Sequence, residues 1–189
     1  MKEALKLLAR CIAVAVMLPS AILCGFGRIS FMFTIFAHAC AQSPGILGDY
    51  IRSAFYWMCL RDFSIDARIS FGTFFAHREA SVGSKAYVGS YCVLGRARIG
   101  ARTQIASHVQ ILSGRHQHSR DDSGQIQGAD DRRDFVEVSI GADCWIGAGA
   151  IVMADVGDGS TIGAGAVVTN PIPPRSVAVG NPARVIREA

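Results

Sequence analysis

The chain has 189 residues, of which 50% are hydrophobic and only 18% are charged, and its mean hydropathy is +0.30. This composition excludes an intrinsically disordered chain, and the length suits one domain with an attached segment. The net charge of +4 is modest and no block of lysine and arginine stands out, so we expect no nucleic-acid binding.

Residues 1–61 are predicted to form a hydrophobic helical region that associates with a membrane. The run Cys11–Gly27 has no charged residue, Arg28 interrupts, and Ile29–Gly48 is again uncharged. A cleaved signal peptide is disfavoured because the apolar region is too long. A transmembrane helix over the first run is short, at roughly 25 Å, and contains Pro19. The other interpretations are a re-entrant or interfacial hairpin that turns near Arg28, and a helical pair buried in an oligomer interface.

Within this region, residues 45–60 are predicted to form an amphipathic helix. Ser43 is expected to cap this helix and Pro44 to stand in its first turn. Apolar residues then recur at helical spacing: Leu47, Tyr50, Ile51, Ala54, Phe55 and Met58. Three polar residues lie off this stripe: Asp49, Arg52 and Ser53. Tyr56 and Trp57 suit a belt at the lipid headgroups, and the same helix also suits a cap on the open end of the domain that follows.

From residue 82 onward, an aliphatic residue followed by a small one recurs every six residues. The pairs are Val82-Gly83, Val88-Gly89, Leu94-Gly95, Ile99-Gly100, Ile105-Ala106, Ile140-Gly141, Ile146-Gly147, Val156-Gly157 and Ile162-Gly163. Each period is a short strand and a turn, three periods close one triangular coil, and stacked coils bury a continuous core. We therefore predict a mainly β protein, with a parallel β-helix over residues 62–189.

A polar segment, residues 115–137, interrupts the repeat and is predicted to be a loop that protrudes from the solenoid. The repeat, the stretch Ile111–His118, the stretch Asp143–Gly147 and the C-terminal tail Gly180–Ile186 resemble the hexapeptide-repeat acyltransferases. The chain is most similar to the O-acetyltransferases of bacterial polysaccharide and lipid-linked sugar assembly. The resemblance covers about residues 62–187. It implies a left-handed β-helix and a homotrimer with each active site between two adjacent β-helices.

The resemblance implies that His116 is the general base. Transfer of an acyl group from a thioester to a sugar hydroxyl requires removal of the hydroxyl proton, and a neutral imidazole with a pKa near ~6.5 is available for this. His118 is the rival for this role, or a substrate contact. Asp121 or Asp122 is a candidate to orient the imidazole, with a solvated loop carboxylate as the alternative. Backbone N–H groups at Ser113 and the glycine after it are candidates to stabilise the oxyanion.

The resemblance also implies acetyl-CoA as the co-substrate. Six residues match the family's cofactor positions: Trp145, Ala148, Ala164, Thr169, Arg184 and Arg187. In the family the alanine positions meet the pantetheine arm through main chain, and the threonine position lies near the adenine. The two arginine positions lie near the nucleotide phosphates, and the tryptophan packs beside the slot. The alternatives are corner packing for the two alanines, a solvated tail for the two arginines and a plain subunit interface for the tryptophan.

We therefore predict an acetyl-CoA-dependent O-acetyltransferase that acts on a sugar hydroxyl of a polysaccharide precursor, lipid-linked by expectation. The expected location is the cytoplasmic face of the bacterial inner membrane, because acetyl-CoA is cytoplasmic and the basic Lys2, Lys6 and Arg10 favour a cytoplasmic N-terminus. With both ends inside, the apolar region dips into the membrane and returns.

Three alternatives to this function are a soluble sugar or sugar-nucleotide acceptor, a non-catalytic trimeric scaffold for glycan assembly, and a zinc enzyme of the γ-carbonic anhydrase type. The zinc enzyme is disfavoured because none of the five histidines forms the H-x4-H pair that it needs. The six cysteines contain no CxxC motif, so we expect buried reduced thiols and no metal.

Overall fold

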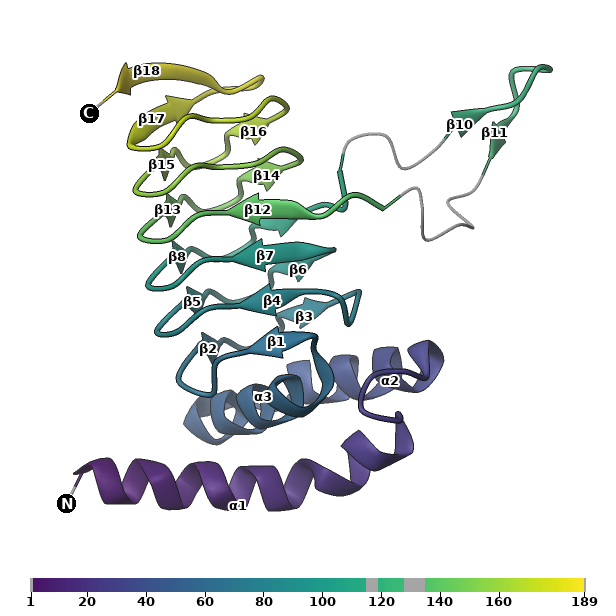
Figure 1. Cartoon of the computed structure of the whole chain (residues 1–189), viewed down its shortest axis with the longest axis vertical. Helices are drawn as coiled ribbons and strands as arrows, with labels where there is room; N and C mark the ends of the chain where they lie inside the picture. Colours follow the sequence, from purple (N-terminus) through teal and green to yellow (C-terminus); the bar gives the residue numbers. More distant parts are fainter. Residues whose placement is uncertain (1, 115–118, 128–134, 189) are drawn as a thin grey trace.

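The computed structural model describes residues 2–114, 119–127 and 135–188. Within these ranges, three helices lie at one end and a tall stack of short strands rises from them (Figure 1). This architecture confirms the mainly β solenoid and the N-terminal helical region that the sequence predicts.

Three sheets form the three sides of the solenoid. Side A contains β1 (Asp62–Phe63), β4 (Ser81–Val82), β7 (Ala97–Ile99) and β12 (Val138–Ile140). Side B contains β2 (Arg68–Ile69), β5 (Tyr87–Val88), β8 (Gln104–Ile105), β13 (Trp145–Ile146), β15 (Thr161–Ile162), β17 (Ser176–Val179) and β18 (Arg184–Glu188). Side C contains β3 (Phe74–Phe75), β6 (Val93–Leu94), β9 (Gln110–Ile111), β14 (Ile151–Val152) and β16 (Val167–Val168). Neighbouring strands within a side run parallel, except that β18 folds back antiparallel over β17.

The inward position of each strand holds one buried apolar side chain, and these residues stack in register from coil to coil. Ile146 pairs with Ile105 on one side and with Ile162 on the other, and all three are fully buried. The small residue that follows is needed because the coils approach closely at the corners. A Cβ on Gly147 would lie 2.4 Å from the backbone nitrogen of Ala164.

The first coil precedes the regular repeat that we read from residue 82. Phe63, Ile69 and Phe75 occupy its inward positions and pair with Val82, Val88 and Leu94 of the next coil, as their strand register shows. Serine or alanine follows each of these three residues, in place of glycine. The solenoid therefore begins at β1, one coil before the aliphatic–glycine pairs.

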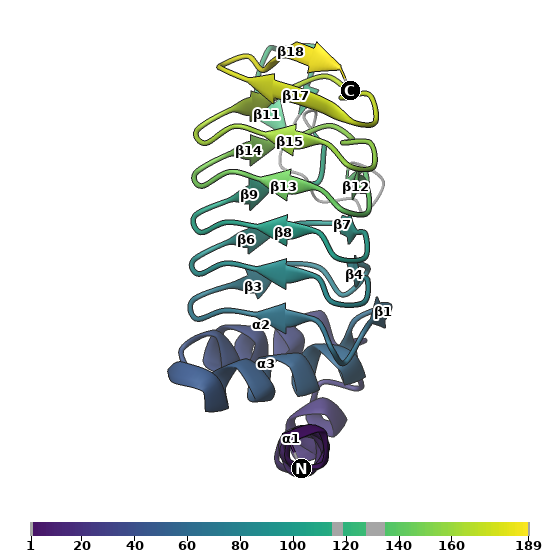
Figure 2. The ribbon, with the colours of Figure 1, turned by 90° about the vertical axis from the view of Figure 1, so that its left-hand side faces the viewer.

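The helical base consists of α1 (Lys2–Leu23), α2 (Ser30–Ala41) and α3 (Gly45–Cys59). α3 packs against the first coil, and α1 lies beneath α3, across the direction in which the coils stack (Figures 1 and 2). The segment Glu3–Leu23 is long and apolar enough to cross a membrane, by length and composition only.

Two predictions for α3 were wrong. The helix begins at Gly45, and Pro44 is its N-cap without a side-chain cap bond, so Ser43 does not cap it. Tyr56 does not face a headgroup belt, because it is fully buried and its ring lies 4.8 Å from that of Phe75 in the first coil.

The polar face of α3 points toward the solenoid. Arg52 is fully buried, and its guanidinium donates hydrogen bonds to the carbonyl oxygens of Ile69 (2.8 Å) and Ser43 (2.6 Å) and to Oδ1 of Asp49 (2.7 Å). By contrast, Leu47 on the apolar stripe is 74% exposed. A buried guanidinium is tolerated only when it is paired and hydrogen-bonded, so Arg52 acts as the joint between the helical base and the first coil.

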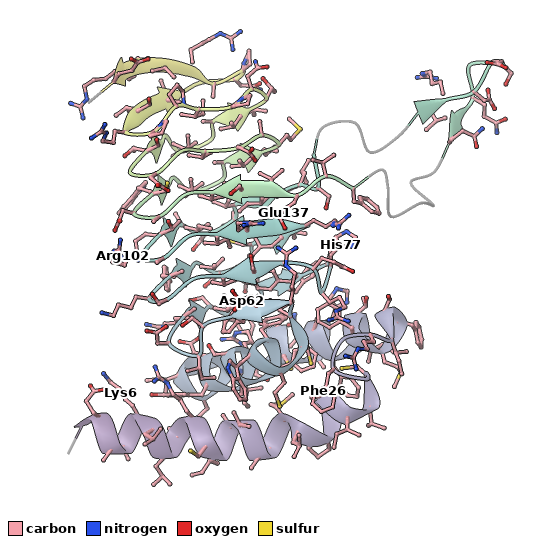
Figure 3. All side chains as sticks on the ribbon, in the orientation of Figure 1. Lys6, Phe26, Asp62, His77, Arg102 and Glu137 are labelled. Carbon is pink, nitrogen blue, oxygen red and sulfur yellow. The ribbon has the colours of Figure 1, made fainter. Side chains whose placement is uncertain are left out.

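α1 also has two unlike faces. Its basic residues lie toward the rest of the protein and its large apolar residues face outward, the reverse of a helix on the surface of a soluble protein. Lys6 and Arg10 line a pocket of about 370 Å³ together with Asp49 and Asp66, so they face the solenoid (Figure 3). The large apolar residues of its other faces are exposed: Leu5, Leu8, Ile12, Val16, Ile22 and Leu23. These six residues form what we call the apolar underside.

Candidate functional site

The loop that contains the predicted base leaves the solenoid at the corner between side C and side A. Ser113 follows β9, is buried, and its Oγ accepts a hydrogen bond from the backbone N–H of Arg96 (2.9 Å). The N–H of Val136 donates to the carbonyl oxygen of Ser113 at 3.1 Å. Gly114 has φ +84°, and a Cβ on it would lie 3.1 Å from that of Val136. Ser113, Gly114 and Val136 thus form a compact loop root.

Three arginines hold the returning segment of the loop. Arg96 Nη1 donates to the carbonyl oxygen of Phe135 at 2.7 Å. Glu137 pairs with Arg98, whose Nη2 lies 2.6 Å from its Oε1, and with Arg61. Burial alone would raise the pKa of Glu137, but hydrogen bonds from Arg61 and Arg98 outweigh it and leave the pKa below its ordinary value. Glu137 is therefore ionised at neutral pH.

His116 and His118, predicted as base and rival, lie outside the described residues. The middle of the loop forms a hairpin of β10 (Ser119–Arg120) and β11 (Ile126–Gln127), which lies apart from the solenoid (Figure 1).

Asp121 shapes the turn of this hairpin. Its Oδ1 accepts hydrogen bonds from Ser123 Oγ (2.6 Å) and from the backbone N–H of Gln125 (3.0 Å), and its Oδ2 accepts one from Gln127 Nε2 (2.7 Å). These hydrogen bonds, that from Ser123 first, lower the pKa of Asp121. Asp122 is exposed in the same turn. The orienting role of Asp121 or Asp122 stays a prediction. Asp121 also has a structural role, because its carboxylate holds the turn of the hairpin.

Ala148 and Ala164 lie one above the other at the corner between sides B and C, and both are exposed. The N–H groups that follow them are used within the solenoid, that of Gly149 by Ser107 O (3.0 Å) and that of Gly165 by Ala148 O (2.8 Å). Among the described residues, the N–H groups of Ala148 and Ala164 have no backbone carbonyl as an acceptor. Two exposed amides about 4.8 Å apart fit an amide-bearing chain such as pantetheine.

The other predicted cofactor residues fall in different places. Trp145 is exposed on side B, over a shallow pocket of about 190 Å³ that Tyr87 and Gln104 also line. Thr169 lies at the corner of the loop root, in a pocket of about 260 Å³ with Gly114 and Val136. One chain therefore does not bring Thr169 together with Ala148 and Ala164.

The two predicted phosphate-binding arginines are exposed on β18, at the far end of the solenoid. Arg184 pairs in register with Val179, and Arg187 with Val177. They lie above side B, at the opposite end from the helical base (Figure 2).

A pocket that we did not predict opens near the loop root, lined in part by His77, Arg78 and Arg96. One signal for it was present, because the pairs Leu94-Gly95 and Ile99-Gly100 are five residues apart, and Arg96 occupies this shortened turn.

Five of the six cysteines are buried. Cys92 and Cys144 are buried inside the solenoid, and burial raises the pKa of both thiols. Cys11 is exposed, contrary to the expectation that all six thiols are buried. Within the ranges that the structure describes, no three histidine, cysteine, aspartate or glutamate residues gather as metal ligands.

Comparison with known proteins identifies the repeat. The family described as bacterial transferase hexapeptide (six repeats) matches residues 137–170. The galactoside O-acetyltransferase of Escherichia coli K12 is 51% identical over 53 residues, which are 27% of this chain and 26% of that protein. The chain thus spans about a quarter of the length of the curated relatives it matches.

Solved structures extend the likeness over most of the chain. A maltose O-acetyltransferase from Clostridium difficile 630 covers 88% of this chain and 88% of its own, with 26% identity and a TM-score of 0.62. A hexapeptide-repeat acetyltransferase from Vibrio cholerae shares the fold, at 18% identity and a TM-score of 0.67, over 87% of this chain and 90% of its own. The N-acyltransferase AntD of Bacillus cereus, solved with dTDP and 3-hydroxybutyryl-CoA, shares the fold over 67% and 70%, at 20% identity and a TM-score of 0.53. Residues 137–170 thus match the hexapeptide-repeat family, and most of the chain shares its fold with solved hexapeptide-repeat acetyltransferases.

Proposed function

We propose that this protein is an acetyl-CoA-dependent O-acetyltransferase that acts on a sugar hydroxyl. The observation that carries the proposal is the 51% identity with a galactoside O-acetyltransferase, within a solenoid shared with a maltose O-acetyltransferase. Both relatives are sugar O-acetyltransferases by name, and the exposed corner amides of Ala148 and Ala164 suit the pantetheine arm.

The chemical step requires one base and one oxyanion site. His116, as a neutral imidazole, takes the proton of the sugar hydroxyl while its oxygen attacks the thioester carbonyl carbon. The carbon–sulfur bond breaks as the tetrahedral intermediate collapses, and the imidazolium returns its proton to the departing thiolate. Backbone N–H groups at the loop root are the candidates to stabilise the oxyanion. A base of this kind accelerates transfer by ~10²–10⁴.

A homotrimer is part of the proposal. The loop root lies at the corner between sides C and A, whereas Ala148 and Ala164 lie at the corner between sides B and C. A site that uses both corners therefore needs two chains side by side, as the family resemblance implies, and Trp145 on exposed side B is available for such contacts. The left hand of the β-helix belongs to the same proposal.

Membrane attachment through the apolar underside is also part of the proposal. The charged residues Lys6 and Arg10 of α1 face the solenoid, while Leu8, Ile12 and Val16 are exposed on its outer faces. A helix that lies flat at the interface has this polarity, because one face is wet and the other is in lipid. The arrangement favours the interfacial interpretation over a single span. It suits a lipid-linked acceptor at the cytoplasmic face of the bacterial inner membrane.

The proposal is tested with the detergent-purified protein and radiolabelled acetyl-CoA, in the presence of a lipid extract from the source cells. His116→Ala is compared with His38→Gln, which changes an exposed histidine of α2, away from both the loop and the corner of Ala148 and Ala164. We expect label in a glycolipid, a loss of ~10²–10⁴ in rate for His116→Ala, and no loss for His38→Gln.

Other outcomes point to the alternatives. Label in soluble sugars or sugar nucleotides, but not in lipid, keeps the chemistry and leaves the underside as a localisation device only. Equal rates for wild type and His116→Ala, with His118→Ala inactive, transfer the role of the base to His118. No transfer and no acetyl-CoA binding favour the non-catalytic scaffold.

A further inference from the structure

A pocket of about 250 Å³ lies where the helical base meets the first coils, on the edge from which the loop also leaves (Figure 3). Its floor is the turn between α1 and α2 and the start of α2, including Ser30. Its side wall is the corner of the first coil, with His77, Arg78 and Glu79, and its roof is Arg96 and Phe135. The pocket therefore joins three parts of the chain that are far apart in sequence.

The floor of the pocket is held in place by close packing. Gly27 has φ +82°, and a Cβ there would lie 2.4 Å from the carbonyl oxygen of Cys59 and 3.4 Å from Cβ of Arg78. Because any side chain at Gly27 would collide with the end of α3, the turn between α1 and α2 sits tightly beneath the first coil.

The pocket contains more positive than negative charge. Arg78 and Arg96 contribute two guanidinium groups, His77 an imidazole and Glu79 a carboxylate. Arg96 also anchors the returning loop through Phe135 O, and the ring of His77 lies 4.7 Å from that of Phe135. Arg78 is half-buried, and its guanidinium forms no ion pair with any of the described residues.

These groups match two kinds of ligand chemistry at once. Guanidinium groups bind phosphate oxygens through paired, charge-assisted hydrogen bonds. A carboxylate accepts hydrogen bonds from hydroxyl groups, for which a sugar has several. The corner of His77 lies two coils below that of Ser113, or roughly 10 Å at the ordinary strand spacing, so one ligand can reach from Arg78 to the loop root.

We propose that this pocket binds the phosphate of a sugar that is linked to a lipid through that phosphate. Arg78 and Arg96 bind the phosphate, Glu79 accepts hydrogen bonds from the sugar hydroxyls, and the sugar extends upward to the loop root. The lipid chain leaves past the turn between α1 and α2, on the side of the apolar underside. This inference deepens the proposed function and rests on it.

Binding is measured first, by calorimetry on the full-length protein in detergent, without acetyl-CoA. The probes are galactose 1-phosphate esterified to a dodecyl chain, dodecyl galactoside without the phosphate, and galactose 1-phosphate without the chain. We expect the phosphodiester to bind at least tenfold more tightly than either of the other two. Arg78→Gln reduces that affinity about tenfold, because one charge-assisted contact is lost, and Arg78→Lys restores part of it.

The matched control is Arg102→Gln. Arg102 is an exposed arginine on another corner, where it pairs with Asp143 at 2.5 Å (Figure 3). An equal loss in Arg102→Gln, or equal binding of dodecyl galactoside, overturns the proposal. Equal binding of galactose 1-phosphate also overturns it, because the lipid then contributes nothing to recognition. Arg78-dependent binding to phosphatidylglycerol vesicles, with no binding of the phosphodiester, assigns the pocket to bulk headgroups instead.

Acetyl transfer then separates this proposal from the proposed function. With the phosphodiester as acceptor, we expect Arg78→Gln to raise KM about tenfold and to leave kcat and the KM for acetyl-CoA unchanged. Transfer to dodecyl galactoside is unaffected by Arg78→Gln. Binding without transfer in the wild type keeps the pocket and rejects the transferase, whereas transfer that ignores both the phosphate and Arg78 keeps the transferase and rejects the pocket.

Discussion

The solenoid and the helical base differ in what they bury and in what they expose. In the solenoid, stacked residues such as Ile105 and Ile146 fill the interior, and polar residues such as Gln104 face solvent. In the helical base, Arg52 is fully buried at the joint with the first coil, while Leu8 and Ile12 are exposed. The difference teaches that an amphipathic pattern must be interpreted against the surroundings of each face, and the lipid contact proposed for α1 follows from that interpretation.

The largest effect is expected at the joint between the two regions. Arg52→Met removes the hydrogen bonds to Ile69 O, Ser43 O and Asp49, and leaves these buried acceptors without that donor. Breaking a buried pair costs about 3–5 kcal/mol, so thermal unfolding should shift to a markedly lower temperature. Limited proteolysis should then cut between the helical base and the solenoid first. A variant with an unchanged Tm would show that the joint does not hold the base.

The next effect tests the outer faces of α1. The triple change Leu8→Ser, Ile12→Ser and Val16→Ser should weaken binding to anionic lipid vesicles about 100-fold. Complete burial of a side chain of this size is worth about 1.5–3 kcal/mol, and partial insertion at an interface about 1 kcal/mol for each of the three. It should leave the Tm in detergent nearly unchanged. Ile126→Ser, equally exposed in the hairpin, is the control. If vesicle binding persists while the oligomer dissociates, the underside is a subunit interface.

A smaller effect is expected inside the solenoid. Ile146→Val removes one buried methyl group between Ile105 and Ile162 and should cost about 0.5–1.5 kcal/mol. Chemical denaturation measures this value from the shift in midpoint. A much larger loss in the free energy of unfolding would mean that single coils do not tolerate local repacking. It would contradict the regular packing that the strand register indicates.

The smallest effect is expected at the clamp on the returning loop. Glu137→Gln should cost about 0.2–1 kcal/mol at neutral pH, because Arg61 and Arg98 are partly exposed and solvent weakens the pairs. The folded pKa of Glu137 is lowered, so its contribution is complete above the unfolded pKa of about 4.3 and is lost as the pH falls through the folded value. Wild type and variant should therefore converge in stability only when the pH falls below the lowered pKa of Glu137. A difference that stays constant throughout the acid range would contradict the assignment.

The coils of the solenoid could be predicted because their geometry repeats a chemical requirement. Every sixth position is apolar, and where two coils approach closely at a corner the next residue is small, as Gly147 shows. The first coil was harder to predict from the sequence, because Phe63 and Phe75 replace aliphatic residues and serine or alanine follows them. The sequence also predicts that Thr169 and Ala164 lie at different corners. Ile162, before Ala164, and Val168, before Thr169, are one hexad apart and therefore on different sides.

The joint and the pocket could not be predicted in the same way. The partners of Arg52 are backbone carbonyls of residues 12 and 9 positions before it and 17 after it, and such acceptors carry no sequence signature. Arg78 and Arg96 follow the paired strands β3 and β6, so coil stacking brings them together, whereas the floor beneath them comes from the packing of the Gly27 turn against the end of α3. Contacts between unlike parts of a chain depend on tertiary placement, which a local period does not contain.

The antiparallel strand β18 has a consequence for how copies of this chain can associate. A stack of parallel coils ends in an open strand edge, which is a template for another chain to continue the stack into a fibre. Here Arg184, Arg187 and Glu188 lie across that edge on β18, and α3 covers the opposite end. Both ends are therefore unsuited to stacking of further coils, and the homotrimer proposed above would associate through the sides of the solenoid.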